Sequence, residues 1–271
     1  MPELPEVETT VRGLKRVLKG ERIARVEVRR PDLRRPFPDG LGQRLTGARI
    51  EKLWRRAKYG LLDTDRGDTL IFHLGMSGRW RIDPSDIGKH DHLVLETAAG
   101  RQLSLNDPRR FGSVDLVATD AVQDFAGFAG MGPEPVGAPL TGRTLGERLA
   151  GKATPIKLAL LDQRVIAGLG NIYVCEALYR AGIAPGRKAG SVGKARLDAL
   201  AGHIQAVLEE AIEAGGSTLR DYAAPDGELG YFSKRFDVYG REGEECRGCG
   251  GQVRRRVQGG RSTFYCAKCQ S

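Results

Sequence analysis

The stretch CRGCGGQVRRRVQGGRSTFYCAKC, residues 246–269, contains four of the five cysteines of the chain. Its two CxxC pairs, Cys246 with Cys249 and Cys266 with Cys269, are separated by sixteen residues, which matches the spacing of a four-cysteine zinc site. Between the pairs, QVRRRV and STFYC alternate like two strands, and QGGR supplies the turn. The stretch therefore predicts a β-hairpin closed by one structural Zn²⁺ per chain, because four thiolates leave no open position for catalysis.

The arginines of this hairpin indicate what it binds. A guanidinium group pairs bidentately with phosphate oxygens, so a rigid hairpin tip that carries arginine is suited to phosphate binding. For Arg254 and Arg256 a merely solvated basic strand is also a credible interpretation. Arg261 is the stronger candidate, because it follows two glycines that permit close approach of the backbone.

The composition favours a soluble protein with a polyanionic partner. The 271 residues are enough for about two domains. The formal net charge is +9, and nucleic acid is the usual partner of such a chain, although a generally basic surface would also explain the charge. We find no apolar stretch of membrane-spanning length and no signal-peptide pattern, so we expect a cytoplasmic protein without a membrane partner. The fifth cysteine, Cys175, lies in a helical pattern without a ligand at suitable spacing, which predicts a core position.

The first 130 residues predict a β-sandwich domain. Residues 5–19 read as a helix, because apolar residues recur every three or four positions from Val7 to Leu18. From about residue 22 to 119 the pattern changes to the alternation of apolar and polar residues that is typical of strands. We therefore expect residues 1–130 to form a sandwich with the first helix packed against it.

The remainder of the chain predicts a helical domain followed by the hairpin module. The Gly- and Pro-rich stretch at residues 131–142 predicts a linker. Helical patterns follow and are clearest over residues 191–216, so we expect a helical domain over residues 143–237. Within it, residues 217–237 have turn chemistry and few aliphatic residues, which predicts a long functional loop. Residues 238–271 then form the zinc module.

The N-terminal stretch MPELPEVETT permits two interpretations. Proline suits a first helical turn, and carboxylates there offset the helix dipole, so the pattern taken alone favours a helix start. The second interpretation is chemical, because removal of Met1 would expose Pro2 as a secondary amine with a pKa near 8, against about 10.4 for lysine. Such an amine can add to an aldehyde-level carbon and form an iminium, with Glu3 beside it as a proton donor. Glu6 lies three residues further on, on the same helical face.

Several motifs in the same order resemble one family. MPELPEVET, RRAKY, HLGMSG, KHDH, NDPRRFG, MGPEP, GLGNIY and the zinc hairpin together are similar to the bacterial formamidopyrimidine-DNA glycosylase family, over residues 2 to about 270. The resemblance implies an α+β fold, with an N-terminal β-sandwich, a helix–two-turn–helix domain and the zinc hairpin. It implies removal of 8-oxoguanine and formamidopyrimidines from double-stranded DNA, preferably opposite cytosine, through a Schiff base followed by β,δ-elimination. It further implies a monomer, associated with the bacterial nucleoid, that needs no redox or nucleotide cofactor.

The resemblance also implies roles for individual residues in the chemistry. Pro2 corresponds to the nucleophile that attacks the sugar, and Glu3 to the acid that assists opening of the sugar ring, with Glu6 in support. Lys58 in RRAKY corresponds to a residue that assists β-elimination, and Arg261 to one that takes part in the second elimination. Without the resemblance, Lys58 would be taken for an ordinary strand lysine.

Two further groups are implied to contact DNA. One is a wedge that fills the gap left by an extruded base, namely Met76, Arg109 and Phe111. A flexible thioether and an aromatic ring can replace lost base stacking, and Arg109 can hydrogen-bond the orphaned cytosine. The other group would contact the DNA backbone and contains His73, His90, Arg109, Lys152, Lys157 and Asn171.

Two alternative functions remain open. One is the related branch of endonuclease VIII type, which removes oxidised pyrimidines, but its members start with PEGPE and lack the full wedge. The other is a non-catalytic zinc-hairpin protein that binds DNA damage. This alternative explains the net charge and the cysteines. It does not explain Pro2, Glu3, Lys58 or the wedge. Relatives often carry a denser basic run before PIK than the GKAT present here, which predicts a weaker phosphate contact at Lys152.

Overall fold

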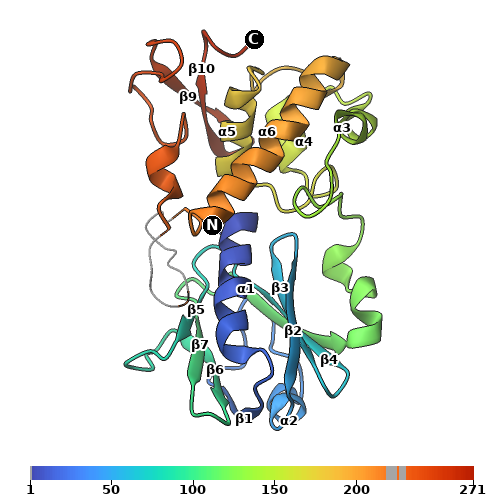
Figure 1. The fold of residues 1–271 in the computed structure, drawn as a ribbon, viewed down its shortest axis with the longest axis vertical. Coiled ribbons are helices and arrows are strands. Elements are labelled where there is room, and N and C mark those ends of the chain that lie inside the picture. Colours follow the sequence, from blue (N-terminus) through green and yellow to red (C-terminus); the bar gives the residue numbers. More distant parts are fainter. Residues whose placement is uncertain (1, 218–224, 226–229) are drawn as a thin grey trace. The chain divides into compact units, whose positions relative to one another are not determined.

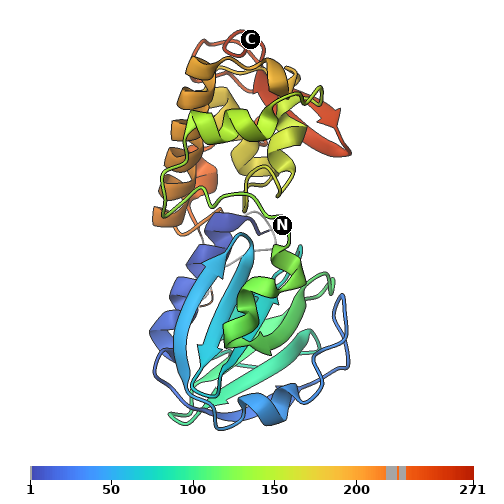
Figure 2. The same ribbon diagram turned by 90° about the vertical axis from the view of Figure 1, so that its right-hand side faces the viewer.

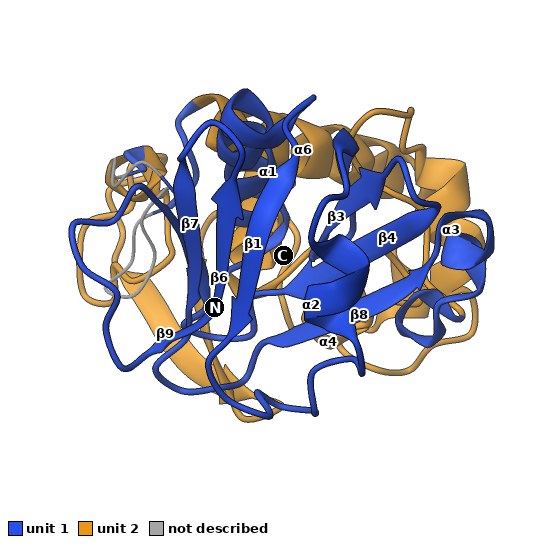
Figure 3. Ribbon diagram, turned by 90° about the horizontal axis from the view of Figure 1, so that it is seen from below, with its two compact units in different colours: residues 1–129, 214–231 blue, residues 130–213, 232–271 orange. Residues whose placement is uncertain are grey.

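The computed structural model describes residues 2–217, 225 and 230–271. The chain divides into two compact units (Figure 3). The first contains residues 1–129 and 214–231, and the second contains residues 130–213 and 232–271. No helix in the described part of the chain has the length and apolar character needed to cross a membrane.

The first unit is a sandwich of two antiparallel four-stranded sheets (Figures 2 and 3). One sheet has the order β1-β6-β7-β5, and the other has the order β2-β3-β4-β8. Their bounds are Ile23–Val28 (β1), Ile50–Arg56 (β2), Tyr59–Thr64 (β3), Asp68–His73 (β4), Arg79–Ile82 (β5), Asp91–Thr97 (β6), Gln102–Asn106 (β7) and Ser113–Ala118 (β8). A short helix, α2 (Leu41–Leu45), joins β1 to β2, and two 3-10 turns, Thr119–Asp124 and Ala126–Phe128, follow β8. The alternating apolar residues of the strands face a shared core, as the sequence predicts.

Helix α1 (Leu4–Leu18) packs along β2 and β3 of one sheet and β5 of the other (Figure 1). Its apolar stripe from Val7 to Leu18 is buried in the sandwich core. The helix starts with a capping box, in which Glu3 and Glu6 each accept the other's backbone N–H. The helix ends before Gly20, which has a φ of +86° that favours glycine. The predicted helix over residues 5–19 is therefore confirmed to within one residue at each end.

The second unit contains four helices and the C-terminal hairpin. The helices are α3 (Gly142–Leu149), α4 (Ile156–Leu161), α5 (Asn171–Arg180) and α6 (Lys194–Glu213), with 3-10 turns at Ala189–Ser191 and Phe232–Arg235. Helix α6 packs against α3 and α5, and α5 also contacts the hairpin strand β10. Cys175, on α5, is buried in the core, as predicted.

The predicted hairpin is present as β9 (Val253–Gln258) and β10 (Arg261–Cys266), which pair antiparallel. The turn between them consists of Gly259 and Gly260, whose φ angles of +54° and +72° belong to the left-handed region that suits a two-residue hairpin turn.

The segment that follows α6 packs with the first unit, although it was predicted to be part of the helical domain. Ser217 donates two hydrogen bonds to the Glu6 carboxylate, and the Pro225 carbonyl accepts a hydrogen bond from Ile82 N–H. These contacts between residues distant in sequence assign residues 214–231 to the sandwich unit. Of the predicted loop over residues 217–237, residues 218–224 and 226–229 lie outside the described part of the chain.

Candidate active site and metal centre

The first turn of α1 holds the predicted acid in a buried carboxylate pair. Pro2 is buried directly before the helix, and Glu3 and Glu6 are each 2 % exposed. One oxygen of Glu6 accepts the backbone N–H of Glu3 at 2.8 Å, and the other accepts the N–H and the hydroxyl of Ser217, both at 2.9 Å. Glu6 therefore fixes the backbone directly beyond Pro2.

Lys58 lies in the tight turn between β2 and β3 and is only 9 % exposed. The preceding residue, Ala57, has a φ of +52°, a strained conformation for a residue that is not glycine. Arg55 stabilises this turn by donating to the Ala57 carbonyl at 2.9 Å. Arg55 also pairs with Glu8 of α1 at 3.0 Å, so the start of the helix and the Lys58 turn lie at the same end of the sandwich.

Strand register brings the predicted wedge to this end as well. Tyr59, the first residue of β3, pairs with His73 at the end of β4, and His73 pairs with Ser113 at the start of β8. The loops that leave β4 and enter β8 are residues 74–78, with Met76, and residues 107–112, with Arg109 and Phe111. In the other sheet Arg79 pairs with Asn106, and Asn106 pairs with Asp91, next to His90.

The wedge residues are not part of the sandwich core. Phe111 is 44 % exposed, Arg109 is exposed, and Met76 is half-buried. The Arg109 guanidinium lies 4.9 Å from the centre of the Phe111 ring, in a cation–π contact. An exposed aromatic ring on a loop is available to stack on a base, whereas a core phenylalanine is not.

His73 is held as a neutral ring with a defined tautomer. Gly75 N–H donates to His73 Nδ1 at 3.0 Å, so Nδ1 is unprotonated and Nε2 carries the ring hydrogen. Burial, together with the nearby cations of Lys58, Arg34 and Arg35, lowers the pKa of His73 to about 4. The ring can therefore donate one hydrogen bond to a phosphate oxygen at neutral pH. His90, the other predicted histidine contact, is half-buried, and its ring lies 6.3 Å from that of His92.

We expect the NMR resonances of the His73 ring to show no titration between pH 8 and pH 5. Because the fold lowers the pKa of His73 from 6.5 to about 4, its contribution to stability is present above about pH 6.5 and is lost as the pH falls toward 4. A His73→Gln variant identifies the resonances and should lose less stability over that range. A ring that titrates near pH 6.5 would contradict this assignment.

The second unit brings Lys157, Asn171 and the hairpin together. Lys157 is fully buried, and its ammonium group donates to the Thr263 hydroxyl at 2.9 Å and to the Ser262 carbonyl at 3.2 Å. The Asn171 amide also donates to the Ser262 carbonyl, at 2.9 Å. Both residues thus hold the strand that begins at Arg261. A direct phosphate contact by Lys157 remains a prediction, since the structure shows it holding the hairpin from within.

Arg261 and Lys152 are both accessible to solvent. Arg261 is exposed directly beyond the two-glycine turn, and its contact with phosphate stays a prediction. Lys152 follows α3 and is half-buried. Asn171 is the first residue of α5, and its Oδ1 atom is buried without a hydrogen-bond partner in the described part of the chain. A donor group of a ligand or a water molecule could bond to this oxygen.

Glu176 is a buried residue that sequence reasoning missed. Its carboxylate, on α5, accepts the backbone N–H groups of Asp237, Val238 and Tyr239 at 2.8, 3.0 and 2.8 Å. Burial raises the pKa of this carboxyl group, although these three hydrogen bonds act in the opposite direction. The Tyr239 hydroxyl in turn lies 3.5 Å from the Asn171 amide. The signal in the sequence that could have revealed this residue is a glutamate within the otherwise apolar pattern of α5.

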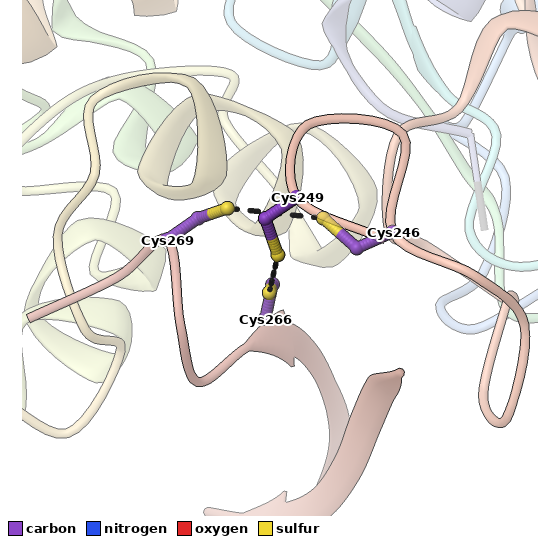
Figure 4. A group of neighbouring side chains, drawn as sticks. All are labelled: Cys246, Cys249, Cys266 and Cys269. Carbon is purple, nitrogen blue, oxygen red and sulfur yellow. Dashed lines mark hydrogen bonds between the residues drawn. The ribbon is translucent and has the colours of Figure 1, made fainter. Parts of the chain in front are cut away.

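The four predicted metal ligands converge, and their side chains point toward one another (Figure 4). Cys249 Sγ lies 3.5 Å from Cys266 Sγ, and Cys246 Sγ lies 3.8 Å from Cys269 Sγ. These separations are too long for disulfides, which have S–S bonds of about 2.05 Å. They fit a tetrahedral zinc site with Zn–S bonds of about 2.3 Å, in which sulfurs lie about 3.8 Å apart. The group is therefore able to hold a metal ion.

Two thiols of the cluster, Cys246 and Cys269, have pKa values that are shifted in opposite directions. Burial raises the pKa of Cys246, but hydrogen bonds from the Tyr179 hydroxyl and two backbone N–H groups outweigh it and lower the pKa to about 6. Hydrogen bonding to Cys249, followed by burial, raises the pKa of Cys269 to about 12. A divalent cation held by the four sulfurs would stabilise all of them as thiolates.

Comparison with known proteins identifies the family. The model of the formamidopyrimidine-DNA glycosylase N-terminal domain matches residues 1–114, and that of the formamidopyrimidine-DNA glycosylase H2TH domain matches residues 131–223. The formamidopyrimidine-DNA glycosylase of Rhizorhabdus wittichii is 68 % identical over 270 residues, and that of Novosphingobium aromaticivorans is 66 % identical over 270 residues. Both alignments cover 100 % of this chain and 100 % of the relative.

Solved structures agree with these relatives. Wild-type Lactococcus lactis Fpg in complex with N7-benzyl-Fapy-dG containing DNA has a TM-score of 0.91 at 36 % identity, and covers 99 % of each chain. The complex of Lactococcus lactis Fpg with abasic-site containing DNA has a TM-score of 0.92, with the same identity and coverage. The predicted fold class is thus confirmed, from the sandwich with its helix to the H2TH domain and the cysteine cluster. The chain belongs to the formamidopyrimidine-DNA glycosylase family.

Proposed function

We propose that this base-excision repair glycosylase removes 8-oxoguanine and formamidopyrimidines from double-stranded DNA and then cuts the strand. The observation that carries the proposal is the first turn of α1, where Pro2 precedes a buried Glu3 whose backbone is fixed by Glu6. A residue that only starts a helix needs a cap. It does not need a second buried carboxylate, such as that of Glu6, which is held by Ser217. We further propose that the protein acts as a monomer in the cytoplasm, at the bacterial nucleoid.

The first stage of the reaction releases the base. After removal of Met1, the amine of Pro2 attacks C1′ of the sugar, a C–N bond forms, and the bond from C1′ to the base breaks. The base leaves with the proton that the Pro2 nitrogen gives up, and Glu3 donates a second proton to O4′ as the sugar ring opens. The product is an iminium on Pro2, whose positive charge makes the C2′ proton acidic. Glu3 is the general acid of this stage.

The second stage cuts the strand in two eliminations. Loss of the C2′ proton expels the 3′ phosphate, with Lys58 assisting the proton transfer. A further proton loss expels the 5′ phosphate, and here Arg261 assists by stabilising the charge of the departing phosphate. Hydrolysis of the remaining iminium frees Pro2. Every step uses the Pro2 amine, side chains and water, so no redox or nucleotide cofactor is required.

The remaining residues bind and deform the DNA. Met76 and Phe111 fill the gap left by the extruded base, since unstacking costs a few kcal/mol that an inserted side chain can partly offset. Arg109, beside Phe111, hydrogen-bonds the orphaned base and favours cytosine. His73, His90, Lys152, Lys157 and Asn171 position the phosphates. One Zn²⁺ on the four cysteines keeps the Arg261 hairpin rigid.

We expect borohydride to trap a covalent complex between the protein and a duplex that carries one 8-oxoguanine opposite cytosine. Reduction converts the iminium into a stable amine, and mass spectrometry of the digested complex should locate the crosslink on Pro2. The control replaces 8-oxoguanine with guanine and should give no complex. A crosslink on a lysine would contradict the role of Pro2. Tight binding to the lesion duplex without a crosslink or strand cutting would contradict the proposed reaction and favour a non-catalytic damage binder.

A further inference from the structure

The two loops that carry the wedge residues are tied to each other by one buried side chain. Asp107 is fully buried at the start of the loop that carries Arg109 and Phe111. Its Oδ1 atom accepts a hydrogen bond of 2.6 Å from the hydroxyl of Ser77, which belongs to the loop that carries Met76. The carboxylate thus joins one wedge loop to the other.

The same group fixes the backbone on both sides of Phe111. The Oδ2 atom of Asp107 accepts the N–H of Gly112 at 2.8 Å, directly after Phe111. The Ser77 hydroxyl accepts the N–H of Arg109 at 3.1 Å while it donates to Asp107. Arg110 lies between Arg109 and Gly112 in the sequence and has a φ of +57°. The loop is therefore held in a conformation that a non-glycine residue rarely adopts.

The loops also touch directly. A Cβ atom on Gly75 would lie 2.3 Å from the backbone of Phe111, so only glycine permits this approach. Phe111 is therefore an exposed ring on a rigid base. A ring that must enter a stack of bases loses effect when its position varies, because misplacement by about 1 Å can cost about a hundredfold in rate.

We propose that Ser77 and Asp107 are positioning residues for base extrusion, which set the placement of Met76, Arg109 and Phe111 relative to one another. The proposal rests on the wedge described under the proposed function. Neither residue touches the substrate. Their effect passes through the wedge, so it should become smaller when the wedge ring of Phe111 is absent.

The test is a double-mutant cycle of Ser77→Ala and Phe111→Ala. Ser77→Ala should lower the single-turnover rate of 8-oxoguanine release by about tenfold and leave cutting at a ready-made abasic site nearly unchanged. In the Phe111→Ala background, Ser77→Ala should lower that rate by clearly less than tenfold. The fluorescence of a 2-aminopurine next to the lesion, which rises when its neighbour unstacks, should show slower extrusion in Ser77→Ala.

Ser104→Ala is the matched control. The Ser104 hydroxyl is also buried and donates to a buried aspartate, Asp91 of β6, at 2.8 Å, so its side-chain bond joins two strands and does not hold either wedge loop. An equal loss of activity in Ser104→Ala would assign the effect to stability and overturn the proposal. The proposal would also be overturned if the fold-losses in the single-turnover rate caused by Ser77→Ala and Phe111→Ala simply multiplied in the double variant. Unchanged activity in Phe111→Ala itself would instead overturn the wedge assignment on which the proposal rests.

Discussion

Glu3→Gln is expected to lower the release of 8-oxoguanine by about a thousandfold, in line with the loss of a general acid. Glutamine has nearly the shape of glutamate, and its carbonyl oxygen can still accept the backbone N–H of Glu6 in the capping box. The start of α1 should therefore remain intact. The side chain can no longer supply a proton during opening of the sugar ring.

The same variant should cut a ready-made abasic site almost as fast as the wild type. At such a site the base is already absent and the sugar reaches the open aldehyde by itself, so the Schiff base on Pro2 can form without the acid. The measurement compares single-turnover rates on an 8-oxoguanine duplex and on an abasic duplex. Glu51→Gln, an exposed carboxylate on β2, serves as the control for the loss of one negative charge. Equal loss of both reactions in Glu3→Gln would show that Glu3 does not act in the excision step alone.

The features that could be predicted from sequence are those encoded locally. The stripe from Val7 to Leu18 specifies α1, because helical periodicity needs no distant partner. The two CxxC pairs specify the ligand set for the same reason, as their spacing and the hairpin between them lie within 24 residues, 246–269. The roles of Pro2 and Lys58 came from resemblance to a family, since no local pattern distinguishes a reactive amine from a helix start.

The features that could not be predicted depend on contacts between residues distant in sequence. The bond between Glu6 and Ser217 spans 211 residues and assigns the segment after α6 to the sandwich unit. Lys157 reads as a surface cation, yet it is buried by its bond to Thr263, 106 residues away. Burial and hydrogen-bond partners of this kind are set by tertiary packing, which a single sequence does not reveal.

Cys249→Ser is expected to release the zinc ion and to weaken DNA binding by about ten- to a hundredfold. The hairpin of β9 and β10 has only two short strands, which by themselves are marginally stable. Metal binding therefore supplies much of the free energy that folds the module. Without it, Arg261 is no longer fixed, and loss of one charged hydrogen-bonding contact costs about 1.5–3 kcal/mol.

Zinc content and the Kd for a lesion duplex should be measured in parallel, with Cys175→Ala as the control. Cys175 packs against the cysteine cluster without belonging to the ligand set, so this variant also loses one thiol from the same core but should retain zinc and affinity. The turn end of the hairpin has a second support, because Lys157 and Asn171 both bond to Ser262. If the zinc-free variant binds DNA with an unchanged Kd, these two residues alone hold Arg261 in place, and the metal is not required for binding.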